Sequence, residues 1–165
     1  MGKIFGVKCS DCDYEFSANV GHGMAGCGFF EYSTNSGKPD YYDYIKDEKI
    51  IADIDRLVET AEDLREDTDK YSKHVNWWGH GSAQYYCKHC NILHNRFYFR
   101  LIYTGGKYEP VYNCSKCDKK LVLVELMQTD DEEIKFKADN NLKWKCPTCG
   151  GNKLLKSNKG CIMYD

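Results

Sequence analysis

Residues 87–117 read CKHCNILHNRFYFRLIYTGGKYEPVYNCSKC, a run that begins and ends with two cysteines separated by two residues. Between these pairs, residues 96–103 and 107–113 are rich in aromatic and β-branched side chains, and a Thr-Gly-Gly sequence separates them. This pattern predicts two strands joined by a tight turn. We therefore expect a β-hairpin between two cysteine turns, followed by a third strand at 121–126.

The same cysteine spacing occurs twice more, so that eight of the ten cysteines form four C-x-x-C pairs. The pairs are Cys9 and Cys12, Cys87 and Cys90, Cys114 and Cys117, and Cys146 and Cys149. Repeated C-x-x-C in a cytosolic chain indicates metal binding before disulfides. Two such turns complete a tetrahedron of thiolates around one ion. We predict two zinc ions in two four-cysteine sites, with iron as the minor alternative because an all-sulfur shell suits both metals.

The four pairs can be combined in two ways. In the nested arrangement the hairpin joins the middle pairs, 87/90 and 114/117, and the outer pairs, 9/12 and 146/149, make the other site. In the sequential arrangement 9/12 combines with 87/90, and 114/117 combines with 146/149. We favour the nested arrangement because the hairpin would bring its flanking pairs together. It also ties the two ends of the chain to each other.

Residues 43–73 are predicted to form one long helix. Apolar residues recur at alternating steps of four and three from Ile50 to Tyr71, interrupted only by Thr68, which is typical of an apolar helix face. The segment holds eleven acidic and six basic residues, so the helix would be acidic. The expected fold is a small metal-stabilised α+β protein, in which two zinc ribbons made of short antiparallel hairpins have this acidic helix inserted between them.

We expect one compact unit made of three segments. Residues 1–34 and 128–165 would form a discontinuous terminal zinc ribbon that carries a glycine-rich loop. Residues 43–73 would be the helical insertion, and residues 85–127 the central zinc ribbon. Residues 134–138 alternate apolar and lysine side chains, as in a half-buried strand.

Three further groups of residues are weaker candidates for function. Gly21, Gly23 and Gly26 could present backbone N–H groups to an anion, although a plain turn is the commoner role of such glycines. Cys27 lies five residues after His22, as a nucleophile and its base could, whereas a buried free cysteine is more usual for Cys27 and Cys161. A recognition surface could include Trp77, Trp78, Arg96, Arg100 and Lys107.

The layout resembles that of small bacterial tandem zinc-ribbon proteins of uncharacterised function. The resemblance rests on the order of the motifs along nearly the whole chain: a cysteine pair, a Gly-x-Gly-Met loop at 21–24, a helical segment, a pair followed by Arg96-Phe97-Tyr98, a plain pair, and a closing CPxCG at 146–150. It implies two four-cysteine zinc sites and implies no particular activity.

Composition excludes several classes of protein. The chain has 23 Lys and Arg against 25 Asp and Glu, a formal net charge of −2, which excludes a strongly basic nucleic-acid coat. Its apolar runs are far shorter than the ~20 residues of a membrane span. The first sixteen residues lack the apolar core of a signal peptide. We therefore expect a cytoplasmic protein that does not enter a membrane.

We predict a zinc-binding recognition or adaptor module that acts through protein–protein contacts, in a regulatory or phage-defence setting. The alternative is a nucleic-acid-binding zinc ribbon, because Arg96, Arg100 and Lys107 lie among tyrosines that can stack on bases. An enzyme that uses Cys27 and His22 is the third hypothesis. A homodimer through the 43–73 helix is the alternative to packing of that helix within one chain.

Overall fold

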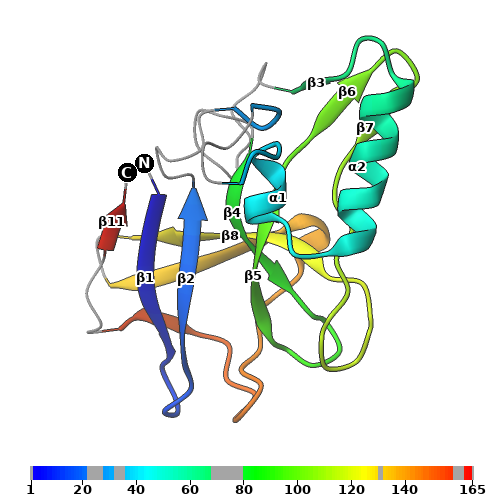
Figure 1. Cartoon of the computed structure of the whole chain (residues 1–165). Coiled ribbons are helices and arrows are strands. Elements are labelled where there is room, and N and C mark those ends of the chain that lie inside the picture. The colour runs from blue at the N-terminus through cyan, green and yellow to red at the C-terminus, as the bar shows by residue number, and fades with distance from the viewer. Residues whose placement is uncertain are drawn as a thin grey trace.

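The structure is a computed structural model that describes residues 2–21, 28–31, 36–67, 80–129, 132–157 and 162–164. Within these residues the chain is mainly β (Figure 1). The strands are β1 (Gly2–Cys9), β2 (Glu15–Gly21), β3 (Arg65–Glu66), β4 (Gly81–Tyr86), β5 (Leu93–Tyr98), β6 (Leu101–Tyr103), β7 (Gly106–Tyr108), β8 (Val122–Gln128), β9 (Glu133–Ala138), β10 (Leu154–Lys156) and β11 (Ile162–Tyr164). The helices are α1 (Tyr41–Tyr44), α2 (Glu48–Thr60) and the 3-10 turn η1 (Asp139–Asn141).

The main sheet closes on itself. Its strands follow the order β10-β9-β8-β4-β2-β1, and β10 pairs again with β1, so six strands form a closed barrel. Val7 of β1 lies opposite Lys156 of β10 at this closure. Of the pairings between barrel strands, that of β2 with β4 is the shortest and consists of one residue pair, Gly21 with Ser82. Strand β11 adds to β1 beside β10, and β5 pairs with the full length of β4.

The barrel encloses one of two hydrophobic clusters. Apolar side chains from all six strands point into it, because each strand alternates inward and outward residues. Trp144, which precedes the last cysteine pair, is only 2% exposed and is the largest side chain of this cluster. The barrel cluster consists of Phe5, Val7, Cys9, Ala18, Tyr86, Leu93, Val124, Leu126, Ile134, Trp144, Cys146 and Leu154.

The second cluster lies beside the barrel, under the two helices. Ile50 and Ile54, one turn apart on α2, are both buried in it. Asp47 begins α2 by accepting hydrogen bonds from the backbone N–H groups of Lys49 and Ile50, at 3.1 and 3.2 Å. The helix cluster consists of Phe29, Tyr41, Ile45, Ile50, Ile54, Ala83, Tyr85, Cys87, Phe97, Tyr98, Phe99, Leu101, Tyr112, Cys114 and Leu121.

The expected α+β fold with a long inserted helix is wrong. The segment 43–73 is interrupted at 45–47 between α1 and α2, and α2 ends at Thr60. Beyond it, the Asp63 carboxylate accepts hydrogen bonds from the N–H and the hydroxyl of Thr104, and β3 pairs with β6. Pairing with a distant strand therefore overrides the apolar periodicity that continues past residue 60. Residues 68–73 lie outside the described residues.

The predicted hairpin exists, but it is shorter than expected and lies elsewhere in the fold. Tyr103 pairs with Gly106, so the turn at 104–105 joins β6 to β7. The expected strand 96–103 is broken at Phe99 and Arg100, because Arg100 accepts a backbone hydrogen bond from Asp67 and pairs with its carboxylate. The hairpin thus belongs to a small sheet, β3-β6-β7, and β5 pairs with β4 instead. The strands expected at 121–126 and 134–138 are confirmed as β8 and β9.

In the part of the chain that the structure describes, no helix combines the length and the apolar character needed to cross a membrane.

Candidate metal centres

All four cysteine pairs lie in turns of the same design. In each, the N–H of the first cysteine donates to the carbonyl five residues later, at 2.7–2.9 Å. In three of the four, the residue after the second cysteine has a positive φ and its N–H donates to the carbonyl of the first cysteine at 2.8–3.0 Å; these residues are Asn91, Asp118 and Gly150. The turn therefore curls the backbone around the sulfur atoms and directs N–H groups toward them.

The outer pairs form the first set, Cys9, Cys12, Cys146 and Cys149. Cys9 is the last residue of β1, and Cys12 lies in the turn that leads to β2. The other two come from the turn before β10. Because β10 pairs with β1, residues about 140 apart in the chain meet at one end of the barrel. The Sγ atoms of Cys9 and Cys149 are 3.6 Å apart, as are those of Cys12 and Cys146.

The middle pairs form the second set, Cys87, Cys90, Cys114 and Cys117. Cys87 follows β4 and Cys90 precedes β5, so this turn closes the β4–β5 hairpin. The other turn lies between Asn113 and Lys120, which face each other in an isolated bridge. The Sγ atoms of Cys87 and Cys117 are 3.5 Å apart. The nested arrangement of the pairs is therefore confirmed, and the sequential arrangement is wrong.

The sulfur spacing fits a metal ion in both sets. Four sulfurs placed ~2.3 Å from one ion at tetrahedral angles are ~3.8 Å apart. In each set the four Sγ atoms lie within 4.8 Å of one another. The first cysteine of every pair is buried, whereas the second is half-buried or exposed, so each set sits at the edge of a hydrophobic cluster. Both sets could therefore hold a metal ion.

The backbone of the turns favours ionisation of some thiols. Burial by itself raises the pKa of Cys146, but N–H groups of Cys149 and Thr148 outweigh it and lower the pKa to about 7. The pKa of Cys114 falls to about 7 in the same way, through N–H groups of Lys116 and Cys117. The opposite holds for Cys90, where hydrogen bonding with Cys117 and burial raise the pKa to about 12. Four thiolates so close together repel one another, and a cation removes this repulsion.

One histidine lies beside the second set. The His94 Nε2 atom is 3.5 Å from the Sγ atom of Cys114. Burial, and to a lesser degree the charge of Arg96, lower the pKa of His94. His94 thus contacts the Cys114 sulfur from outside the group of four cysteines.

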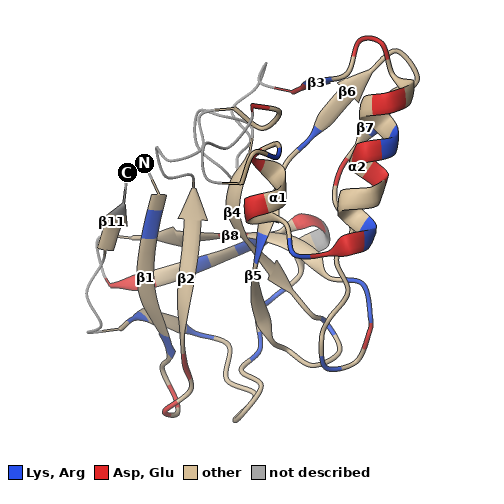
Figure 2. Cartoon of the chain, viewed as in Figure 1, with Lys and Arg blue, Asp and Glu red and all other residues tan. Residues whose placement is uncertain are grey.

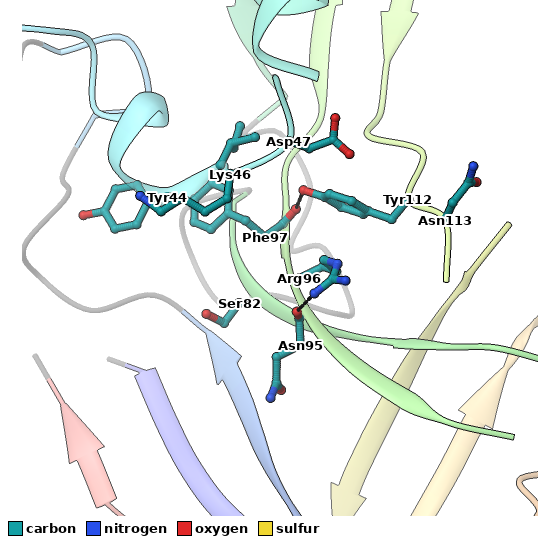
Figure 3. A pocket seen from close by; sticks show the side chains of 10 residues that line it. Tyr44, Lys46, Asp47, Ser82, Asn95, Arg96, Phe97, Tyr112 and Asn113 are labelled. Carbon is teal, nitrogen blue, oxygen red and sulfur yellow. Dashed lines mark hydrogen bonds between the residues drawn. The ribbon is translucent and has the colours of Figure 1, made fainter. Parts of the chain in front are cut away.

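The three basic candidates of the predicted recognition surface have different surroundings. Arg100 pairs with the carboxylates of Asp67 and Glu109, and the Lys107 ammonium lies 3.8 Å from the same Glu109. Arg96 instead lines a pocket together with residues of the α1–α2 connection and with Tyr112 and Asn113 (Figure 3). The three basic residues therefore do not form one surface: Arg100 and Lys107 lie beside carboxylates, whereas Arg96 lines the pocket.

Several candidates fall outside the described residues: His22, Gly23, Gly26, Cys27, Trp77, Trp78 and Cys161. Gly21 is described; it ends β2 with a φ of +87°. His80, which the sequence places next to the tryptophans, is buried, and its Nδ1 atom contacts the Glu66 carboxylate.

The residues that sequence reasoning missed are those that line the pocket beside Arg96. Tyr44 and Lys46 were expected on one continuous helix, whereas Tyr44 ends α1 and Lys46 lies in the connection to α2. Both line the pocket, and the Tyr44 ring stacks on Phe97 of β5. The aromatic run YYDY at 41–44 could have indicated that this segment packs against the rest of the chain, because clustered aromatic residues are unusual on a solvent-exposed helix.

Searches against protein-family models, curated proteins and solved structures found no match to this chain. The resemblance to tandem zinc-ribbon proteins thus rests on the two four-cysteine groups, which are compatible with sites of that kind.

Proposed function

We propose that the protein holds two structural zinc ions and works as a recognition module for another protein. One observation supports the zinc ions: eight cysteines, in four turns of one design, lie together in two complete four-sulfur groups. An all-thiolate tetrahedral shell is closed, so it leaves no position on the ion for a water or substrate. Zinc fits this donor set better than magnesium or calcium, which prefer oxygen ligands.

Metal content tests this part directly. Native mass spectrometry of the protein purified without chelators should find two zinc ions per chain. The spectrum of a cobalt-substituted sample should show the intense thiolate-to-cobalt bands of tetrahedral sulfur sites. A chain purified with no bound metal, or with iron in both sites, contradicts the zinc assignment.

The recognition role is supported by the surface of α2. Figure 2 shows acidic residues gathered on this helix and on the turn that follows it. Val58 is 49% exposed among them. An exposed apolar side chain surrounded by charges is a common composition for a protein interface. Each zinc site with four thiolates carries a charge of −2, so two sites would take the formal charge from −2 to about −6. Such a charge favours a basic protein partner.

A pull-down with the tagged, zinc-loaded protein tests the partner, using lysate divided into nuclease-treated and untreated halves. We expect the same protein to be recovered from both halves, and its recovery to fall when Val58 is replaced by Glu. The matched control is Val111→Glu, which changes a similarly exposed valine (55%) that is not part of α2. Recovery that depends on intact nucleic acid would overturn the protein-partner proposal and favour the nucleic-acid alternative.

A further inference from the structure

The first cysteine set is open to solvent at one of its members. Of the eight cysteines that the structure describes, Cys149 is the exposed one, and the other seven are buried or half-buried. Two glycines follow it in the chain. A Cβ atom on Gly151 would collide with the Asp11 carboxylate and lie 3.3 Å from the Sγ atom of Cys149. Glycine at this position therefore keeps a side chain away from the exposed cysteine.

The second set is better covered. Its first cysteines, Cys87 and Cys114, are buried, and its second cysteines are half-buried. His94 lies against one of them, with its Nε2 atom 3.5 Å from the Sγ atom of Cys114. A thiolate reacts with a dissolved oxidant only where the oxidant reaches it, so oxidation follows exposure. The first set should therefore react before the second.

The surroundings of the first set favour a small neutral oxidant. A hollow of about 770 Å³ lies beside it, with Cys9 and Cys12 among its walls. Four thiolates around one divalent ion add a charge of −2. Anionic oxidants such as glutathione disulfide are repelled by such a charge, whereas hydrogen peroxide is not. The charged residues of the same walls are three carboxylates and one ammonium group: Asp11, Asp13, Glu15 and Lys8.

The close sulfur contacts of the first set join one turn to the other. The Sγ atom of Cys149 lies 3.6 Å from that of Cys9, and the Sγ atoms of Cys12 and Cys146 are also 3.6 Å apart. Pairing of Cys9 with Leu154 in the β1–β10 ladder holds the two turns in this position. Oxidation of these neighbouring sulfurs would link the two ends of the chain to each other.

We propose that the first set is a peroxide-responsive site, in which two disulfides, one joining Cys9 to Cys149 and one joining Cys12 to Cys146, replace the metal ion. The Cys149 thiolate attacks hydrogen peroxide, which gives a sulfenic acid and one hydroxide ion. The Cys9 thiolate then attacks the sulfenic sulfur, forms the disulfide and releases a second hydroxide. A second peroxide oxidises Cys12 and Cys146 in the same way. Four thiolates thus lose four electrons, two peroxides gain them, and the ion is left without ligands.

This reaction changes the charge of the site while it keeps the chain ends joined. The charge of −2 on the loaded set is lost, because two disulfides carry none. Both disulfides run between the two turns, so β1 and β10 stay side by side. The inference rests on the proposed zinc sites and adds regulation to one of them, since the second set keeps its ion.

Zinc release from the reduced, zinc-loaded chain measures the response, with a chromogenic chelator as the reporter. Hydrogen peroxide should release one ion per chain roughly tenfold faster than the other, because the two sets differ in exposure. Glutathione disulfide at the same concentration should release it more slowly. Peptide mapping after alkylation of the remaining thiols should find the two disulfides between the turns. A thiol reductant with added zinc should restore two ions per chain.

Cys149→His tests the role of the exposed thiolate. Three cysteines and one histidine also form a zinc shell, so this variant should hold two ions before oxidation and lose the first roughly fivefold more slowly. The matched control is Cys117→His, the same change at the second cysteine of a pair in the second set. It should leave the fast release within twofold of the starting chain.

Brief treatment of the unaltered chain with iodoacetamide gives a second measurement that does not depend on how a variant folds. Cys149 should be alkylated before the other seven cysteines of the two sets. The proposal is overturned if both ions leave at one rate, if the second set loses its ion first, or if the disulfides form within the 9/12 and 146/149 pairs. It is also overturned if another cysteine of the two sets is alkylated first, or if the two histidine variants slow release equally. A chain without two zinc ions before oxidation contradicts the proposed function instead, and the initial zinc count separates the two failures.

Discussion

At the scale of single residues, the turn around each cysteine pair depends on the residue that follows the second cysteine. Gly150 has a φ of +78°, and Asn91 and Asp118 have φ values of 59° and 57°. Glycine adopts such angles without a steric penalty, and Asn and Asp tolerate them better than other residues. The sequence allowed this to be anticipated at Gly150. At Asn91 and Asp118 the local sequence is also compatible with an ordinary turn, so the geometry could not be predicted there.

Replacing Gly150 by Ala should destabilise the zinc-loaded protein by ~1–2 kcal/mol, because a Cβ atom clashes with the backbone at this angle. No other atom lies within 4 Å of where that Cβ would be, so the cost comes from backbone strain alone. Urea unfolding measures it. The control is Gly150→Asn, which places at this position the residue that Asn91 provides in another turn, and which should cost less than Ala. Equal losses for Ala and Asn would contradict the strain argument.

Replacing Cys146 by Ser should lower the zinc count from two ions per chain to one. Ser lacks a thiolate, and Cys146 is the member of its set whose pKa the backbone lowers to about 7. Native mass spectrometry gives the count. Cys27→Ser changes a cysteine that lies outside the four C-x-x-C pairs of the sequence and should keep two ions. Retention of two ions by the Cys146 variant would show that the first set does not act as a four-sulfur site.

At the scale of elements, what could be predicted depended on how local each interaction is. Strands β8 and β9 follow from alternating side chains, and the turn between β6 and β7 follows from its glycines. The prediction of one helix over 43–73 was wrong because apolar periodicity carries no information about distant partners. Here residues 63–66 bond to Thr104 and pair with β6 instead of continuing the helix. Closure of the barrel by β1 and β10 is likewise a contact between distant segments that no local pattern encodes.

Within α2, Ile54 should be the residue most sensitive to truncation. It is fully buried in the helix cluster, so Ile54→Ala should cost ~2–5 kcal/mol through lost burial and a cavity. Val58 lies one turn later on the same helix and is 49% exposed, so Val58→Ala serves as the control and should cost less than ~0.5 kcal/mol. Chemical denaturation compares the two. Similar costs would mean that the apolar face of α2 is not packed against its own chain.

At the scale of the whole molecule, each cysteine set belongs to one hydrophobic cluster. Cys9 and Cys146 are members of the barrel cluster, whereas Cys87 and Cys114 are members of the helix cluster. The zinc ions would therefore act as separate anchors for the two halves of the core. This division depends on which pairs combine, and the nested pairing was the part of the architecture that the hairpin pattern allowed us to favour.

Removal of both metals by a strong chelator should unfold the protein, because metal binding of this kind contributes ~10–16 kcal/mol in small zinc domains. Circular dichroism should show loss of the native signal and of the cooperative thermal transition. The control is re-addition of zinc under reducing conditions, which should restore both. An unchanged melting curve after verified metal removal would falsify the structural role.

Hydrogen exchange of two variants tests whether the sites act separately. Cys146→Ser should increase exchange mainly in β1, β2 and β10, and Cys114→Ser mainly around α2 and β5.

The meeting of β1 with β10 and β11 places both chain ends side by side (Figure 1), and this has a consequence for the newly made chain on the ribosome. Cys87 and Cys117 are 30 residues apart, so at roughly 5–20 residues per second the middle site is complete within roughly 2–6 seconds. Cys9 must await Cys149, 140 residues later, for roughly 7–28 seconds. Until then β1 has no β10 to pair with and exposes an open edge. If both sites hold zinc, as proposed, a cell short of zinc would accumulate chains with the middle site filled, the outer site empty and the edge of β1 open to pairing with another chain.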